Sequence, residues 1–218
     1  MKLLLTSAGL SNKSITDALL EMTEKPFSEL NVAFIPTASN VESGDKFWLI
    51  DDLINLKNLG FKQIDIVDIS ALSKDMWLPR LEKADIFYFE GGNTFHLMRW
   101  IEKSGLKEFL PELLKTKVYV GVSAGSMVAC KNLDLSTSER LYDEKVDENA
   151  KDEGLNFIDF LIRPHLNSQY FPNINLENLE KMSQELPDTF YAIDDQTAIK
   201  IIDGEMSVIS EGVWKKFN

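Results

Sequence analysis

Short, nearly continuous apolar runs recur along the chain and constrain its fold more than any other feature. They cover residues 2–5, 32–35, 64–69, 86–89, 118–122, 190–193 and 198–202. Strands that are apolar on both faces are typical of parallel sheets covered by helices on both sides. Amphipathic segments at 14–24, 47–59 and 94–104 predict such helices. The pattern therefore predicts an α/β fold, a three-layer α/β/α sandwich with a mostly parallel sheet.

Length and composition predict one domain that spans residues 1–218. The 218 residues, 44% of them hydrophobic, are enough to bury one sizeable core. Asp203-Gly204 predicts a hairpin turn between the run at 198–202 and a final strand at 206–209. The acidic, aperiodic segment 143–154 predicts an exposed loop, which could also form a mobile rim of a site.

The charge balance disfavours several classes of partner. The chain has 23 Lys and Arg against 35 Asp and Glu, a net charge of −12, so it lacks the basic surface that binds nucleic acid or anionic membrane. The apolar start stops at Thr6-Ser7, too early for a signal peptide, and no run approaches the ~18 apolar residues of a membrane span. We expect a cytoplasmic protein without nucleic-acid or membrane partners, and a homodimer is left open.

Metal and phosphate chemistry lack the residues they need. Cys130, His96 and His165 are the only cysteine and histidines, so we expect no metal and no cofactor. Cys130 cannot form an internal disulfide and is best interpreted as a small buried hydrophobe. The loop after the first run resembles a Walker loop only superficially, because Ser7 and Asn12 occupy the places of its glycines.

A G-x-S-x-G sequence, residues 121–125, begins within the end of the run at 118–122 and has Ser123 at its centre. A sharp strand-to-helix turn leaves no room for flanking side chains, so glycines surround a serine that stands exposed at the carboxyl edge of the sheet. Ligands of such sheets bind at this edge. We predict that Ser123 is a nucleophile in a crevice shared with the loops after Leu5, Ile35 and Phe89.

A serine nucleophile needs a general base, normally a histidine. His165 follows the apolar run 157–162 and Pro164, which places it on a loop downstream of Ser123. His96 falls on the predicted helix 94–104, where a satisfied or surface side chain is the simpler interpretation. We predict His165 as the base. Ser7, in a Ser-Ala-Gly triplet, is a weaker nucleophile candidate than Ser123.

Acyl transfer also needs N–H donors for the developing oxyanion. The backbone N–H groups of Gly92 and Ala124 are the natural pair, because each follows the end of an apolar run. The Gly91-Gly92 pair can also be a simple turn in which Asn93 or Thr94 caps the next helix.

Four segments together resemble a known family. They are Gly91-Gly92-Asn93-Thr94-Phe95, Gly121 to Gly125, Pro164-His165 and Ile193 to Ala198, in this order. They resemble the serine peptidases of family S51, which contains aspartyl dipeptidase (peptidase E) and cyanophycinase. The resemblance implies a fold similar to class I glutamine amidotransferases (flavodoxin-like), a Ser123–His165 pair, and an oxyanion hole from Gly92 and Ala124. It also implies peptide hydrolysis through an acyl-enzyme without metal or cofactor.

The remaining site residues are less clearly indicated. In the dipeptidase an Asp follows the nucleophile as third member of the triad; here Glu139 is nearest in register, with Asp134 and Asp143 as alternatives. Asn93 and Thr94 are expected to bind substrate. Asp194 and Asp195 could bind a substrate amino group or only cap a turn between two strands.

The sequence thus predicts a serine peptidase, an exopeptidase or dipeptidase-like enzyme that hydrolyses small peptides through a Ser–His acyl-enzyme mechanism. The alternative is a non-catalytic or amidotransferase-like member of the same fold that binds a ligand or partner, in which Ser123 only shapes the turn.

Overall fold

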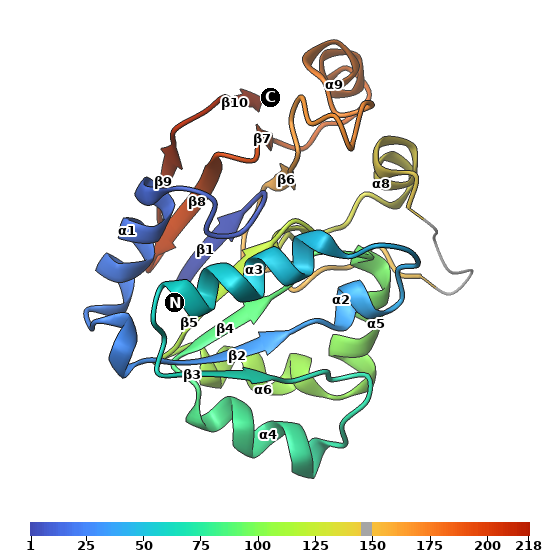
Figure 1. Ribbon diagram of the computed structural model, residues 1–218. Coiled ribbons are helices and arrows are strands. Elements are labelled where there is room, and N and C mark those ends of the chain that lie inside the picture. Colours follow the sequence, from blue (N-terminus) through green and yellow to red (C-terminus); the bar gives the residue numbers. More distant parts are fainter. Residues whose placement is uncertain (145–149) are drawn as a thin grey trace.

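A mostly parallel seven-stranded sheet forms the centre of the molecule (Figure 1). The structure is a computed structural model that describes residues 1–144 and 150–218. The strand order is β3-β2-β4-β5-β1-β8-β9, with β1 to β5 parallel and β8 and β9 antiparallel. The bounds are β1 (Lys2–Thr6), β2 (Asn31–Ile35), β3 (Gln63–Ile66), β4 (Ile86–Phe89), β5 (Val118–Val122), β8 (Thr197–Ile202) and β9 (Glu205–Ser210). The predicted α/β fold is confirmed.

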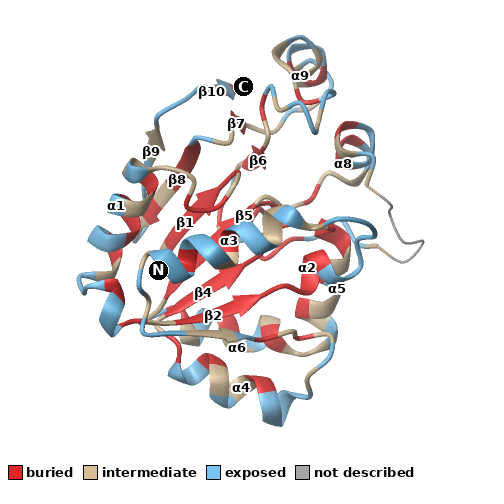
Figure 2. Ribbon diagram, viewed as in Figure 1, coloured by how far each residue is buried: buried red, intermediate tan, exposed pale blue. Residues whose placement is uncertain are grey.

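Helices cover both faces of this sheet because its strands are apolar on both sides. Leu4 packs on the face covered by α1 (Lys13–Thr23) and α3 (Phe47–Asn58). Leu3 and Leu5 pack on the face covered by α4 (Lys74–Lys83), α5 (Thr94–Lys103) and α6 (Leu106–Leu113). Figure 2 shows the central strands β1, β2, β4, β5 and β8 buried and the outer sides of the helices exposed, whereas the edge strands β3 and β9 are only partly buried. The short helices η1 (Phe27–Glu29) and α2 (Thr37–Asn40) lie on either side of β2 in the sequence.

A second, three-stranded sheet corrects one expectation. The run at 190–193 forms β7 (Phe190–Ile193), which pairs with β6 (Leu161–Arg163) and β10 (Trp214–Phe217) rather than with the main sheet. An apolar run shows that a strand is buried but not which strands lie beside it. β6 and β7 run parallel, so the loops that leave them start at the same edge. The helices α8 (Leu135–Tyr142) and α9 (Leu176–Ser183) precede and follow β6 in the sequence.

Two other predicted segments have different outcomes. The hairpin at Asp203-Gly204 is confirmed, since β8 and β9 pair in antiparallel register across it. Of the predicted loop 143–154, residues 145–149 lie outside the described residues, 151–153 are exposed and Gly154 is buried.

Cys130 is buried, and burial raises the pKa of its thiol to about 11. It therefore behaves as the small hydrophobe that the sequence suggested. Among the described residues, no helix has the length and apolar character needed to cross a membrane.

Candidate active site

Ser123 lies in a tight turn between β5 and the four-residue helix α7 (Ala124–Met127), in a strained conformation with φ 47° and ψ −106°. The two flanking glycines make the turn possible. A Cβ on Gly121 would lie 2.6 Å from the backbone of Gly125, and a Cβ on Gly125 would lie 2.1 Å from the carbonyl oxygen of Phe89. Only glycine allows this close packing, so the predicted strand-turn-helix geometry around Ser123 is present.

A chain of hydrogen bonds joins Ser123 to a histidine and a carboxylate. His165 Nε2 lies 2.9 Å from Ser123 Oγ, and His165 Nδ1 lies 2.7 Å from Asp195 Oδ1. Because an ionised carboxylate can only accept, Nδ1 carries the proton and Nε2 is free to accept the serine proton. The side chains follow β5, β6 and β7 respectively. The arrangement has the order nucleophile, base and orienting acid.

Ser7, directly after β1, holds the histidine and the aspartate together. Its hydroxyl accepts a hydrogen bond from the backbone N–H of His165 at 2.7 Å and donates one to Asp195 Oδ1 at 2.8 Å. The backbone of His165 is left-handed, with φ 66°. The imidazole stacks on Phe171 with ring centroids 4.3 Å apart. His165 is thus fixed by contacts to its backbone, its ring face and Nδ1.

Asp195 stays ionised despite its partial burial. Burial raises the pKa of a carboxyl group, but the hydrogen bond and the electrostatic interaction with His165, with further hydrogen bonds from Ser7 and Ser168, outweigh it and lower the pKa of Asp195 below its ordinary value. A charged carboxylate on Nδ1 is the state that orients the imidazole and stabilises an imidazolium.

The expectation that Glu139 completes the triad is not supported by the geometry. Glu139 is exposed on α8, whereas Asp195 bonds to His165. Of the two alternatives, Asp134 forms an ion pair with Arg163 at 2.6 Å, and Asp143 is exposed at the edge of the cleft. The reason is topological: His165 follows β6, which pairs with β7, and the residues that follow β7 include Asp195.

The contacts of Asp194 match the second of its two expected roles, which is to cap the turn between two strands. Its Oδ1 accepts hydrogen bonds from Gln196 N and from Thr197 Oγ1, the latter at 2.7 Å, and its Oδ2 accepts one from Val213 N at 2.6 Å. The carboxylate therefore ties the β7–β8 turn to the chain before β10. A substrate-binding role for Asp194 is not supported, and Asp195 contacts the histidine.

The predicted oxyanion donors follow adjacent strands, β4 and β5. Gly92 has φ 126°, and a Cβ there would lie 2.4 Å from Ala38 O, so only glycine fits. A Cβ on neighbouring Gly91 would lie 3.4 Å from Ser123 Cβ, which places this turn beside the serine. Among the described residues, no backbone carbonyl outside the helices and strands accepts a hydrogen bond from the N–H of Gly92. The N–H of Ala124 has no acceptor within its own helix, because Ala124 is the first residue of α7.

A cleft of about 1040 Å³ surrounds these groups. Ser123, His165 and Gly92 line it together with aromatic side chains such as Trp48 and Phe171. Asn93 and Thr94, the predicted substrate-binding residues, also line it, and Asn93 Oδ1 caps α5 by accepting from His96 N at 2.8 Å. His96 lines the cleft from α5, and burial followed by the charge of Arg99 lowers its pKa.

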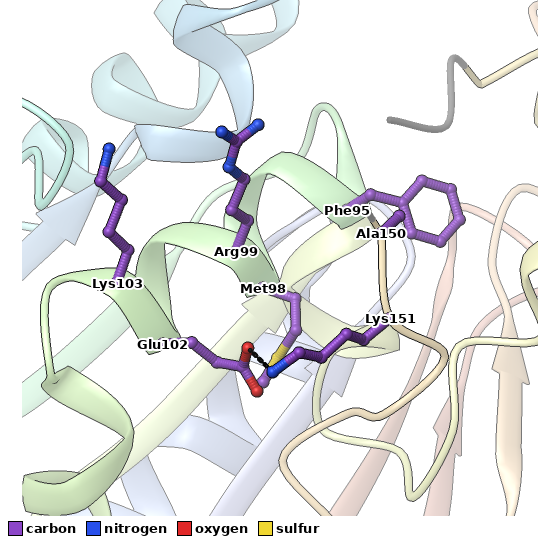
Figure 3. A pocket seen from close by; sticks show the side chains of 7 residues that line it. All are labelled: Phe95, Met98, Arg99, Glu102, Lys103, Ala150 and Lys151. Atoms are coloured by element: carbon purple, nitrogen blue, oxygen red, sulfur yellow. Dashed lines mark hydrogen bonds and ion pairs between the residues drawn. The ribbon is translucent and has the colours of Figure 1, made fainter. Parts of the chain in front are cut away.

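A smaller cavity of about 340 Å³ lies beside α5 (Figure 3). Lys151 reaches Glu102 across it in an ion pair of 3.1 Å, and Met98 lies close to this pair. Neither Ser123 nor His165 contributes to this cavity. The larger cleft is therefore the candidate active site.

The buried carboxyl of Asp52 on α3 makes the free energy of unfolding of the protein depend on pH. Burial raises its pKa from 3.8 to about 6, although Tyr88 donates a hydrogen bond to it at 3.0 Å. A folded-state pKa above the unfolded one gives stability that is complete below the unfolded pKa and is lost as pH rises through about 6.

We expect Asp52→Asn to be more stable than the wild type at pH 7 by about 2 kcal/mol, and the difference to shrink toward pH 4. Urea unfolding at both pH values measures it; an equal difference at both would contradict the expectation.

The fold and the Ser–His–Asp arrangement are typical of hydrolases that work through an acyl-enzyme. The comparisons with known proteins define the class further. The sequence model of peptidase family S51 matches residues 3–209. The chain therefore belongs to peptidase family S51, a family of peptidases.

Individual relatives agree with this family. An uncharacterized peptidase of Pasteurella multocida, PM1590, is 31% identical over 82% of this chain and 84% of its own. A peptidase E of Nostoc is 27% identical over 82% of this chain and 72% of its own. The crystal structure of a Listeria monocytogenes protein assigned as a peptidase E superposes with a TM-score of 0.79 and 28% identity, covering 97% of this chain and 98% of that one.

Proposed function

We propose that this chain is a serine-type exopeptidase, dipeptidase-like, that hydrolyses small peptides through an acyl-enzyme. The observation that carries the proposal is the hydrogen-bonded series Ser123–His165–Asp195 at one edge of two sheets. A cleft of about 1040 Å³ supports small substrates, because it is comparable with sites that enclose ligands of a few hundred daltons.

The proposed mechanism uses only side chains and backbone groups already described. Ser123 Oγ attacks the peptide carbonyl while His165 Nε2 takes its proton. Asp195 stabilises the imidazolium, and the N–H groups of Gly92 and Ala124 donate to the oxyanion. The imidazolium then protonates the leaving amine. Water, deprotonated by His165, hydrolyses the acyl-enzyme and regenerates Ser123.

Labelling with a fluorophosphonate tests the proposal. We expect the wild-type protein to form an adduct on Ser123, located by mass spectrometry, and to cleave members of a dipeptide library. Ser123→Ala should lose both, and His165→Ala should lose most of both. Ser43→Ala is the matched control, because this exposed serine lines the same cleft and should change neither. A folded wild type that forms no adduct and cleaves no peptide would favour a ligand-binding protein instead.

A further inference from the structure

A pair of buried carboxyl groups, Glu90 and Asp52, lines the cleft but takes no part in the proposed mechanism. Glu90 directly follows β4 and is 0% exposed, and Asp52 on α3 is 8% exposed. Burying a carboxylate is costly unless a donor or a cation compensates it. Neither residue takes part in any of the ion pairs that the described residues form.

Glu90 has one oxygen to spare. Its Oε1 accepts a hydrogen bond from Gly91 N at 2.9 Å, which secures the turn that carries Gly92. Its Oε2 is buried and has no N–H or O–H donor among the described residues. The group that it can hydrogen-bond is the carboxyl of Asp52, provided that the two carboxyl groups share a proton. Structural support of the turn therefore explains one oxygen of Glu90, and the other depends on a proton shared with Asp52 or on a donor from a ligand.

The neighbourhood of the pair opens to the cleft along one face of α3. Trp48, Asp51, Asp52 and Asn55 all line the cleft, and their spacing places them on the same side of the helix. Gly9 closes the other side, since its backbone approaches Asp52 so closely that a Cβ would lie 2.6 Å from Oδ1. Carboxylates outnumber Lys and Arg side chains among the residues that line the cleft.

We propose that Glu90 and Asp52 form a subsite that binds a positively charged group of the peptide substrate, a primary ammonium from its N-terminus or from a basic side chain. The oxygen of Glu90 that meets no N–H or hydroxyl donor among the described residues, the burial of two carboxyl groups side by side at the cleft, and the acidic face of α3 carry this inference. Burial and the charge of Asp52 raise the pKa of Glu90, so the pair shares a proton that a bound ammonium would replace. The inference rests on the proposed function and names its substrate class.

Binding to the Ser123→Ala variant tests the subsite without any hydrolysis. Calorimetry would compare lysyl-leucine, norleucyl-leucine and the N-acetylated form of each. A preference for lysine over norleucine assigns the subsite to a side chain, and a loss on acetylation assigns it to the N-terminus. In either case we expect the cationic form to bind about tenfold or more tightly than its neutral counterpart.

Glu90→Gln in the same background should abolish this preference. Glutamine keeps the acceptor for Gly91 N, so binding of the neutral peptides should remain, and a melting curve checks the fold. Asp52→Asn should show the same loss, whereas Glu42→Gln, an exposed carboxylate of the same cleft, should keep the preference. No preference for a cation, or one that survives Glu90→Gln, would overturn the subsite.

The outcomes also separate the two proposals. Cation-selective binding by a protein whose Ser123 never reacts with the fluorophosphonate would keep the subsite and reject the peptidase mechanism. A reactive Ser123 without cation selectivity would do the reverse.

Discussion

Asp195→Asn is expected to lower kcat for a cleaved dipeptide by about 10³–10⁴-fold. The amide of asparagine can turn a donor toward Nδ1 of His165, which favours the tautomer whose Nε2 carries a proton and cannot accept one from Ser123. The side chain keeps its size, so the hydrogen bonds around Ser7 and the fold should persist. Steady-state kinetics on the purified variant measures the effect, with the larger change expected in kcat rather than KM.

Glu139→Gln is the matched control for this experiment. It removes the carboxylate that the sequence favoured for the third position, but that side chain is exposed on α8. We expect wild-type kcat. A large loss in Glu139→Gln with little change in Asp195→Asn would show that the working enzyme uses a different carboxylate from the one beside His165.

Asp134→Asn is expected to lower the free energy of unfolding by about 3–5 kcal/mol. Arg163 is 2% exposed in its side chain, and Asp134 is its ion-pair partner at 2.6 Å. The Nε of Arg163 has no hydrogen-bond partner among the described residues, so loss of the Asp134 carboxylate leaves a buried cation poorly compensated. Asparagine tolerates the left-handed backbone of position 134, where φ is 50°, so the substitution mainly removes the charge.

Urea unfolding measures this loss. Glu185→Gln is the control, because Glu185 pairs with Arg140 at 3.2 Å on the surface, where both side chains are more than half exposed. Such a pair contributes about 0–1 kcal/mol. Equal effects of the two substitutions would contradict the assignment of Asp134 as counter-ion of a buried arginine. Adding Arg163→Met to Asp134→Asn should recover much of the loss, since it removes the uncompensated charge.

The sequence predicts the parts of this molecule that local patterns determine. Continuous apolar runs identify the parallel strands β1, β2, β4 and β5, because burial on both faces leaves few polar positions. The edge strand β3 carries Gln63 and Asp65 and is only partly buried. Gly121 and Gly125, on either side of Ser123, indicate a close approach of backbone to backbone that no other residue permits. His165 follows an apolar run and Pro164, which was enough to place it on a loop at the carboxyl end of a strand.

The parts that depend on pairing between distant segments could not be predicted. Glu139 has the expected spacing from Ser123, but the carboxylate beside His165 comes from the end of a strand paired with β6. Ser7 gave a usable signal, since it directly follows the first strand and so had to lie at the same edge as Ser123. Glu90 begins the loop after Phe89 that the sequence places at the crevice, but nothing in the sequence indicates that it is buried beside Asp52. Asp52 gave no signal, because an acidic residue on a helix is expected to face solvent.

The residues of the proposed catalytic group follow strands of two different sheets. His165 and Asp195 follow neighbouring strands of the small sheet, whereas Ser123 follows a strand of the large one. A change in how the sheets dock alters the gap between Ser123 and His165 and leaves the His165–Asp195 distance as it is. Substitutions at the interface between the two sheets should therefore impair proton transfer from Ser123 to His165. The imidazole keeps its tautomer in such variants, because its hydrogen bond to Asp195 is unchanged.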